Sequence, residues 1–169
     1  MTRTPNTISE TESQPLPIVV GVDGSEASRK ALEWAGREAE VRGQRVLAIS
    51  SYLIPTLGTA APGFLFDPAD VEELTDYHQK VLATEIAAAS QEHPAVQIEG
   101  RTVEGSVAQL LTDASERASR RVVGSRGHGG VVGLLLGSVS QHCATHAHCP
   151  AVVVRPESQV ISLRPAPPE

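Results

Sequence analysis

The chain has 169 residues, of which 40% are hydrophobic and 20% charged, so it can build one packed core and is not disordered throughout. A formal net charge of -6 and an aromatic content of 3% argue against a nucleic-acid partner, which needs cationic and stacking side chains. With only two cysteines, the chain lacks a disulfide framework. These features predict a soluble protein of a reducing compartment, most simply the cytoplasm.

Both ends of the chain have the composition of tails. Residues 1–16 are polar and contain no apolar run of the kind that a signal peptide needs. Residues 156–169 contain four prolines and few apolar side chains. No run of roughly 18 apolar residues is present, so no membrane span is expected. We predict one folded domain over residues 17–155, between two disordered tails.

Five short apolar segments, rich in β-branched residues, alternate with helical patterns inside this domain. The expected strands cover residues 18–22, 45–50, 96–103, 122–124 and 151–154. Such alternation implies right-handed crossovers between parallel strands. The predicted fold is therefore α/β, an open five-stranded, mostly parallel sheet with helices on both faces. Ligands of such sheets bind beyond the carboxyl ends of the strands.

Helix boundaries are marked by capping residues. Ser25 is an expected N-cap, and Gly43 ends the same helix. Asp67 caps a second helix that has proline at its first position and stops before Pro94.

Two later serines have the spacing of a capping box. These are Ser106 with Gln109 and Ser138 with Gln141, each at the start of an expected helix. Between these two helices, Arg121 lies beside the short buried strand. An unpaired buried charge costs several kcal/mol or more, so we expect its guanidinium to reach water or a carboxylate.

A glycine-rich segment over residues 124–138 precedes the last expected helix. Glycine lets the backbone approach a ligand closely, and the free N–H groups at a helix N-terminus favour anions. The segment is neither a Walker A loop nor the dinucleotide fingerprint, because neither spacing is present. It nevertheless reads as a phosphate-binding loop.

The spacing Gly124, two residues, Gly127, nine residues, Gly137-Ser138 resembles the signature of the ATP-binding branch of the universal stress protein family. Residues 18–25 and 149–155 resemble the first and last strands of that family, so the likeness covers about residues 17–155. The resemblance implies a Rossmann-like, adenine nucleotide alpha hydrolase-like fold.

The same resemblance implies which residues bind ATP. Glycines of the signature and its serine would hold the phosphates and ribose, and Arg126 is a possible charge partner for phosphate. Adenine would lie between Val103 and either Ser50 or Ser51, with Asp23 near the adenine or ribose, although Asp23 could instead help to cap the helix that starts at Ser25. The expected binding residues are Asp23, Ser51, Val103, Gly124, Arg126, Gly127, Gly137 and Ser138. Whether Mg²⁺ accompanies ATP is left open.

Catalytic and metal-binding interpretations find less support. His142 and His146 share a helix face, but no acidic third ligand lies nearby in the sequence, so no metal site is expected. Ser125 and Ser138 lack the Gly-x-Ser-x-Gly context of a nucleophile. The loop offers no lysine or carboxylate as a general base, so we expect little or no turnover and leave slow ATP hydrolysis open.

The sequence therefore predicts an ATP-binding universal stress protein that acts as a nucleotide-responsive regulator or stress-survival factor. One alternative is a dimeric interaction module of the same fold that binds no nucleotide, and another is a nucleotide-cleaving α/β enzyme. We also predict a homodimer through Ala151 to Val154, a short uncharged strand without proline or lysine. The resemblance places this strand at a sheet edge and implies dimerisation there.

Overall fold

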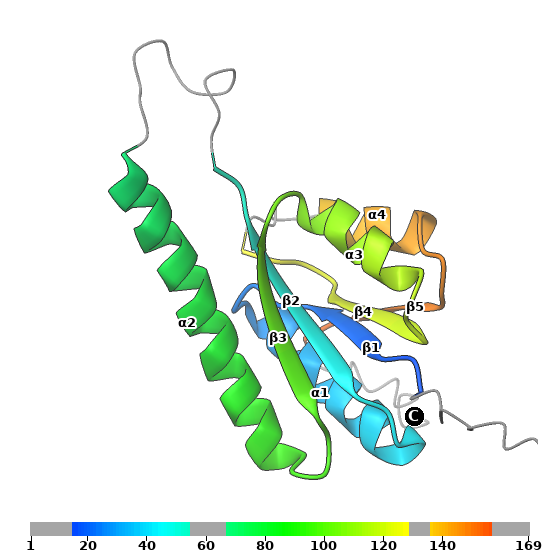
Figure 1. Ribbon diagram of the computed structural model, residues 1–169. Helices are drawn as coiled ribbons and strands as arrows, with labels where there is room; N and C mark the ends of the chain where they lie inside the picture. The colour runs from blue at the N-terminus through cyan, green and yellow to red at the C-terminus, as the bar shows by residue number, and fades with distance from the viewer. Residues whose placement is uncertain (1–14, 55–66, 129–135, 157–169) are drawn as a thin grey trace, which may run out of the picture.

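A single parallel sheet organises the computed structural model, which describes residues 15–54, 67–128 and 136–156 (Figure 1). Its strands are β1 (Ile18–Gly21), β2 (Val46–Tyr52), β3 (Ile98–Glu104), β4 (Arg120–Gly124) and β5 (Ala151–Val154). The strand order is β3-β2-β1-β4-β5, and all four neighbouring pairs are parallel. The predicted α/β fold class is confirmed, with β1 at the centre and β5 at one edge.

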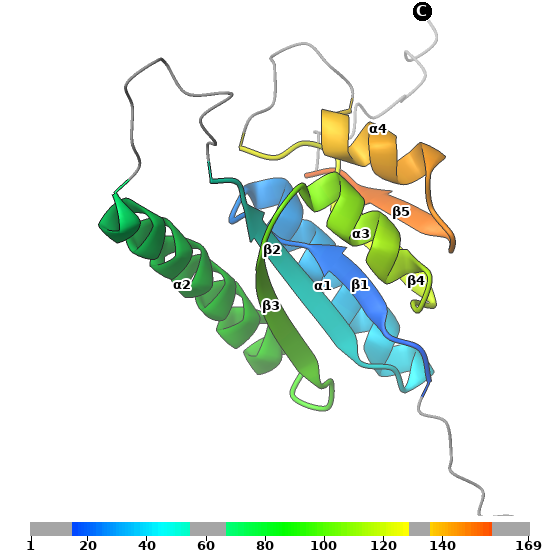
Figure 2. The same ribbon diagram turned by 45° about the horizontal axis from the view of Figure 1, so that its top comes forward.

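Helices cover both faces of this sheet (Figures 1 and 2). The helices are α1 (Glu26–Arg42), α2 (Pro68–Glu92), α3 (Val107–Ser115) and α4 (Ser138–Thr145). The first two pack on one face, and α3 and α4 pack on the other. None of the helices in the described ranges has the length and apolar character needed to cross a bilayer.

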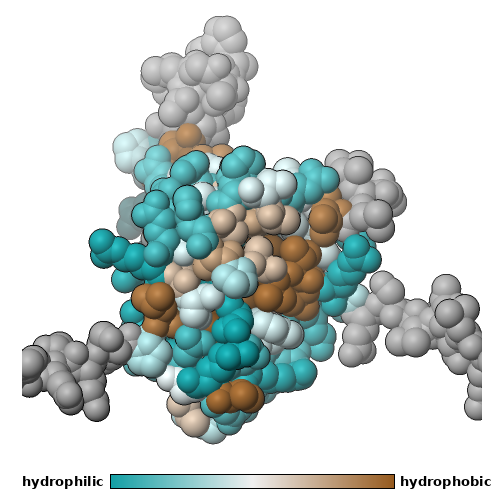
Figure 3. Space-filling model, turned by 90° about the vertical axis from the view of Figure 1, so that its right-hand side faces the viewer, coloured by the Kyte–Doolittle hydropathy of each residue, from teal (hydrophilic) through white to brown (hydrophobic). Residues whose placement is uncertain are grey.

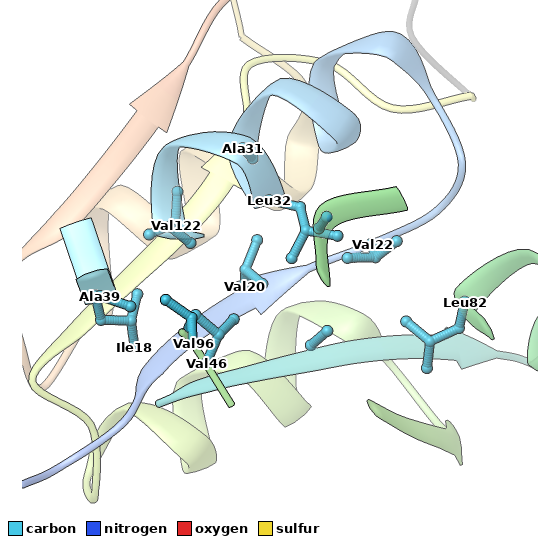
Figure 4. Packing of buried hydrophobic residues seen from close by; sticks show 13 residues of the cluster. Ile18, Val20, Val22, Ala31, Leu32, Ala39, Val46, Leu82, Val96 and Val122 are labelled. Carbon is cyan, nitrogen blue, oxygen red and sulfur yellow. The ribbon is translucent and has the colours of Figure 1, made fainter. Parts of the chain in front are cut away.

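The central strand supplies side chains to both cores. Ile18 and Val20 point toward α1 and α2, as Figure 4 shows, whereas Val19 belongs to the cluster beneath α3 and α4. All three are fully buried. Because successive side chains of a strand point to opposite faces, a strand covered on both sides must be apolar at every position. This requirement explains the continuous apolar run in the sequence.

The first two helices begin and end as predicted. Ser28 donates its backbone N–H to the Oγ of Ser25 at 3.2 Å, and Gly43 adopts a left-handed φ of 61° at the C-terminus of α1. Ala69 donates its N–H to Asp67 Oδ1 at 2.9 Å at the start of α2, where Pro68 is the first helical residue. Local capping chemistry therefore fixes these boundaries.

Both predicted capping boxes are wrong. Ser106 is the N-cap of α3, but its side chain accepts no capping hydrogen bond. At α4 the N-cap is Gly137, so Ser138 is already the first helical residue. The predicted strand limits also shift, since β2 and β3 extend to Tyr52 and Glu104 and β4 begins earlier, at Arg120. The predicted disordered tails fall almost entirely outside the described residues, as do residues 129–135 of the glycine-rich segment.

The expectation that Arg121 reaches water or a carboxylate is also wrong. Because β4 begins one residue before it, Arg121 lies inside the sheet and its side chain is fully buried beneath α3 and α4. Its guanidinium donates to Thr112 Oγ1 at 3.1 Å and to the backbone carbonyl of Cys143, and its Nε has no partner among the described residues. The neighbouring Arg120 is the one that pairs with an acid, Glu38, at 3.5 Å.

This arrangement predicts a small effect of Arg121→Met on stability. Methionine removes a buried charge that lacks a carboxylate partner, and this gain offsets the loss of the donor to the Cys143 carbonyl. We expect the free energy of unfolding in urea to stay within about 1 kcal/mol of the unmodified protein. Arg121→Ala, which leaves a cavity, should lower it by about 2–5 kcal/mol. A loss of more than about 3 kcal/mol in the methionine variant would show that the buried guanidinium is a net stabiliser.

Candidate functional site

A pocket of about 270 Å³ lies where β1 and β4 end. The first residues of α1 and α4 and one side of α3 complete its walls. Parallel strands bring these carboxyl ends to one edge of the sheet, which is where ligands of such sheets bind. Of the predicted binding residues, the following line this pocket: Asp23, Ser51, Gly124, Arg126, Gly127, Gly137 and Ser138.

The end of β2 separates the two candidate adenine serines. Ser50 is buried and its hydroxyl lies 3.3 Å from Nδ1 of His78 on α2, whereas Ser51 lines the pocket. Val103 pairs with Ser51 in the register of β2 and β3, but it is not among the described pocket residues. The alternation of side chains along β2 thus directs Ser51, and not Ser50, toward the site.

Asp23 follows β1 and bonds to backbone on two sides. Its Oδ1 accepts the N–H of Ser25 at 2.9 Å, and its Oδ2 accepts the N–H of His128 at 3.1 Å. Burial raises the pKa of the carboxyl, but the hydrogen bonds from Ser25, Ser28 and His128 together lower it by more, so the pKa lies below its ordinary value. Asp23 therefore both stabilises the turn before α1 and forms part of the pocket.

Each glycine of the signature is required to a different extent. A Cβ at Gly124 would lie 2.7 Å from the backbone carbon of Ala27, so this glycine lets β4 pack against α1. A Cβ at Gly127 would lie 2.3 Å from Oδ2 of Asp23. At Gly137 a Cβ would meet only ordinary contacts, the nearest at 3.6 Å. The first two glycines thus have packing reasons that are independent of any ligand.

The start of α4 is anchored to the end of β4. Gly137 donates its N–H to the carbonyl of Ser125 at 2.8 Å, and the buried Ser140 hydroxyl donates to the carbonyl of Gly124 at 2.6 Å. The first-turn amides of Ser138 and Val139 have no partner within the helix. Neither a side-chain cap nor an acidic residue occupies this turn. This end of the pocket therefore favours an anionic group.

Apolar side chains form another part of the pocket wall. Val107 and Leu111 from α3 line it together with Val123 from β4 and Val139 from α4. A pocket with one apolar wall and one anion-binding end suits an amphipathic ligand that has a planar group and a negative charge. Sequence reasoning did not assign these apolar residues, nor Ser28, His128 and Ser140, to the site.

The histidines and cysteines near α4 do not form a metal-binding arrangement. Within the described ranges, no three residues of the metal-ligating types gather. The rings of His142 and His146 stack with centroids 4.3 Å apart instead of converging on a point. Burial raises the pKa of the Cys143 and Cys149 thiols, and the nearby charge of Arg121 lowers it only in part. The raised pKa makes both thiols poorer nucleophiles.

The glycine contacts predict that two alanine substitutions will lower the free energy of unfolding by different amounts. Gly124→Ala forces the added methyl against the backbone of Ala27 and should lower the free energy of unfolding by about 1–3 kcal/mol. Gly137→Ala adds the same methyl where ordinary contacts surround it, at an extended φ of -74°, so it loses only the preference for glycine over alanine at an N-cap and should lower the free energy of unfolding by less than about 1 kcal/mol. Urea denaturation of the two variants measures both values. Equal losses would contradict the packing role assigned to Gly124.

Comparison with known proteins places this fold and pocket in a family. Residues 16–155 match the sequence model of the universal stress protein family. Universal stress protein MT2052 of Mycobacterium tuberculosis is 36% identical over 156 residues, which cover 84% of this chain and 49% of the relative. Universal stress protein Rv2623 of the same species is 35% identical over 142 residues, covering 84% and 46%. The chain thus spans about half the length of the curated relatives it matches.

Solved structures of the family have the same architecture. A universal stress protein in complex with cAMP is 25% identical, with a TM-score of 0.61, and the match covers 86% of this chain and all of the other. The universal stress protein from Archaeoglobus fulgidus is 24% identical, with a TM-score of 0.60, and the match covers 82% of this chain and 98% of the other. The chain belongs to the universal stress protein family.

Proposed function

We propose that the protein binds ATP in the pocket at the carboxyl edge of the sheet and acts as a nucleotide-responsive regulator or stress-survival factor of the cytoplasm. The observation that carries the proposal is the pairing of an apolar wall with the first-turn amides of α4, which have no partner within the helix. An adenine nucleotide has both features, a planar base and an anionic phosphate chain. We further propose that residues 17–155 form the functional domain, a range that the family match closely follows.

Relatives with bound nucleotides support this ligand class. The neighbour at 25% identity is described in complex with cAMP. More distant neighbours that share the fold are described with dAMP, in the case of the Archaeoglobus fulgidus protein, and with AMP, in the case of an Arabidopsis thaliana protein. Adenine is common to all three ligands. The choice of ATP among adenine nucleotides rests on the glycine spacing of the loop.

We propose a place in the pocket for each part of ATP. The phosphates would lie against Gly137, Ser138 and the amide of Val139, with Arg126 on the exposed side as their charge partner. The base would pack on the apolar wall and meet the hydroxyl of Ser51. We still propose ligand contacts for three more of the predicted residues, Val103, Gly124 and Gly127.

Mg²⁺ would reach this site with the phosphates. Asp23 is the carboxylate that lines the described part of the pocket, and both of its oxygens already accept backbone N–H groups. It is therefore poorly placed to serve as a metal ligand on its own. The described pocket residues also include no lysine and no carboxylate that is free to act as a general base. We accordingly propose little or no ATP turnover.

Enlarging residue 137 tests the proposed site. Gly137→Leu keeps an extended backbone that any residue adopts, yet places a branched side chain where the phosphates approach. We expect the affinity for ATP to fall at least tenfold, or about 1.4 kcal/mol, in an isothermal titration. Gln141→Leu places a leucine on the exposed side of α4 and should leave the affinity unchanged. Unchanged affinity in a folded Gly137→Leu variant would refute the site.

We also propose a homodimer formed through the free edge of β5. Ala151 is exposed and the three valines after it are half-buried. Figure 3, which views the side of the molecule where β5 lies in Figure 1, shows apolar surface gathered on this face. Antiparallel pairing of two copies would satisfy the outward N–H and C=O groups with a two-fold symmetric contact.

Charge at this edge should disrupt the dimer. Val153→Lys and Ala151→Lys are each expected to give monomers in light scattering, because a lysine would have to be desolvated against its symmetry mate. Ala151→Lys substitutes an exposed position and so separates dimer loss from core damage. Ala151→Ser is the uncharged control and should remain dimeric. A monomeric unmodified protein at micromolar concentration would contradict the proposal.

A further inference from the structure

We propose that Asp23 is a positioning residue, which fastens the loop after β4 to the turn after β1 and makes glycine necessary at position 127. The sequence had assigned Asp23 to direct contact with adenine or ribose. The inference concerns how the pocket is held in shape, and its consequence for ligand affinity rests on the ATP function proposed above.

The carboxylate of Asp23 joins the turn after β1 to the loop after β4, beyond the point where β1 and β4 pair with each other. The register of β1 with β4 extends to Val20 opposite Val122; beyond that pair β1 continues to Gly21 beside β2, and β4 continues to Gly124 beside β5. Beyond that point, Asp23 Oδ2 accepts the N–H of His128 at 3.1 Å across a sequence separation of 105 residues. Its other oxygen is bonded to Ser25 in its own turn. The side chain is thus fixed at one end and holds the loop with the other.

Gly127 sits directly against this link. A Cβ built there would lie 2.3 Å from Oδ2 and 3.5 Å from Cγ of Asp23, and no other described atom outside its chain neighbours lies within 4 Å. Gly127 is also not one of the described glycines with positive φ. Alanine could therefore adopt the backbone conformation, and only the carboxylate of Asp23 excludes it.

Charge considerations argue against contact between Asp23 and the phosphates. The hydrogen bonds that hold the pKa of Asp23 below its ordinary value keep the carboxylate ionised at neutral pH. A negative charge beside an anion-binding end would repel phosphate, whereas two backbone amides that point at the carboxylate offset part of that charge. The His128 amide is consequently engaged by Asp23, and the amides of α4 are the ones open to the ligand.

A double-mutant cycle in the ligand-free protein tests the link. Gly127→Ala should lower the folding equilibrium constant about tenfold in the unmodified background, because the methyl displaces the carboxylate. In the Asp23→Ala background the same change should cost less than twofold, because nothing remains for the methyl to meet. Gly137→Ala, whose added methyl does not approach Asp23, is the matched control and should have the same effect in both backgrounds.

Two additions make this test robust. A second variant at position 23 replaces Asp23→Ala if that variant does not fold, and the NMR signal of the His128 amide reports on the link directly. Asp23→Ser keeps a short acceptor for the turn before α1 but does not reach His128, and it replaces Asp23→Ala if that variant is unfolded. The amide proton of His128 should shift upfield in NMR spectra and exchange faster with water in either background. If Asp23 served only its own turn, the Ser25 amide would respond and the His128 amide would not.

The outcomes separate this inference from the proposed function. An equal cost of Gly127→Ala in both backgrounds, or an unchanged His128 amide, overturns the link whether or not ATP binds. If the cycle shows the expected coupling but the unmodified protein does not bind ATP in titration, the link stands and the proposed function fails. If both hold, Gly127→Ala should weaken ATP binding in the unmodified background and have less than a twofold effect in the Asp23→Ala background.

Discussion

The parallel pairing of β1 with both of its neighbours determines where everything else in this protein can lie. Ile18, Val19 and Val20 are fully buried, and β1 is hydrogen-bonded to β2 on one side and to β4 on the other. Its carboxyl end must therefore emerge beside that of β4. Asp23 and the loop that contains Gly127 meet there because the sheet delivers them to the same edge, although they are more than 100 residues apart in the chain.

Rigid anchors then convert this meeting point into a pocket. Ser140 bonds its hydroxyl to the end of β4, and Gly124 allows β4 to touch α1. These contacts hold the first turn of α4 with its free amides facing the space above the sheet. A site built in this way needs no movement to present its donors, which lowers the entropic cost of binding an anion. The same residues thus contribute to stability and to the proposed function, which makes substitutions here harder to interpret than those at Gly137.

Features that depend on neighbouring residues were predictable from the sequence. The apolar run of β1 and the caps at Ser25, Gly43 and Asp67 each follow from residues within a few positions, and the structure has them as predicted. The glycine spacing indicated the family, and seven of the eight binding residues that the resemblance implied line the pocket. The local pattern gave the wrong N-cap for α4, because Gly137 and Ser138 are adjacent and both are residue types that cap helices. The structure has Gly137 as the N-cap.

Features that depend on distant contacts could not be predicted in this way. No local pattern shows that Arg121 is buried beneath α3 and α4, since its partners are a hydroxyl on one helix and a carbonyl on the other. The reason for glycine at position 127 likewise lies in Asp23, far away in the chain. The apolar wall of the pocket combines one strand and two helices, and each of its residues resembles an ordinary core residue when considered alone.

The most direct test of the account is a titration of the isotope-labelled protein with ATP, followed through its backbone amide signals. If ATP binds as proposed, the amides of Ser138 and Val139 should shift most and saturate together, because they are the free donors of the pocket. The amide signals of Val46 and Ile98, at the amino ends of β2 and β3 and so far from the pocket, should not shift. Saturable shifts confined to another surface, or none at millimolar ATP, would contradict the account.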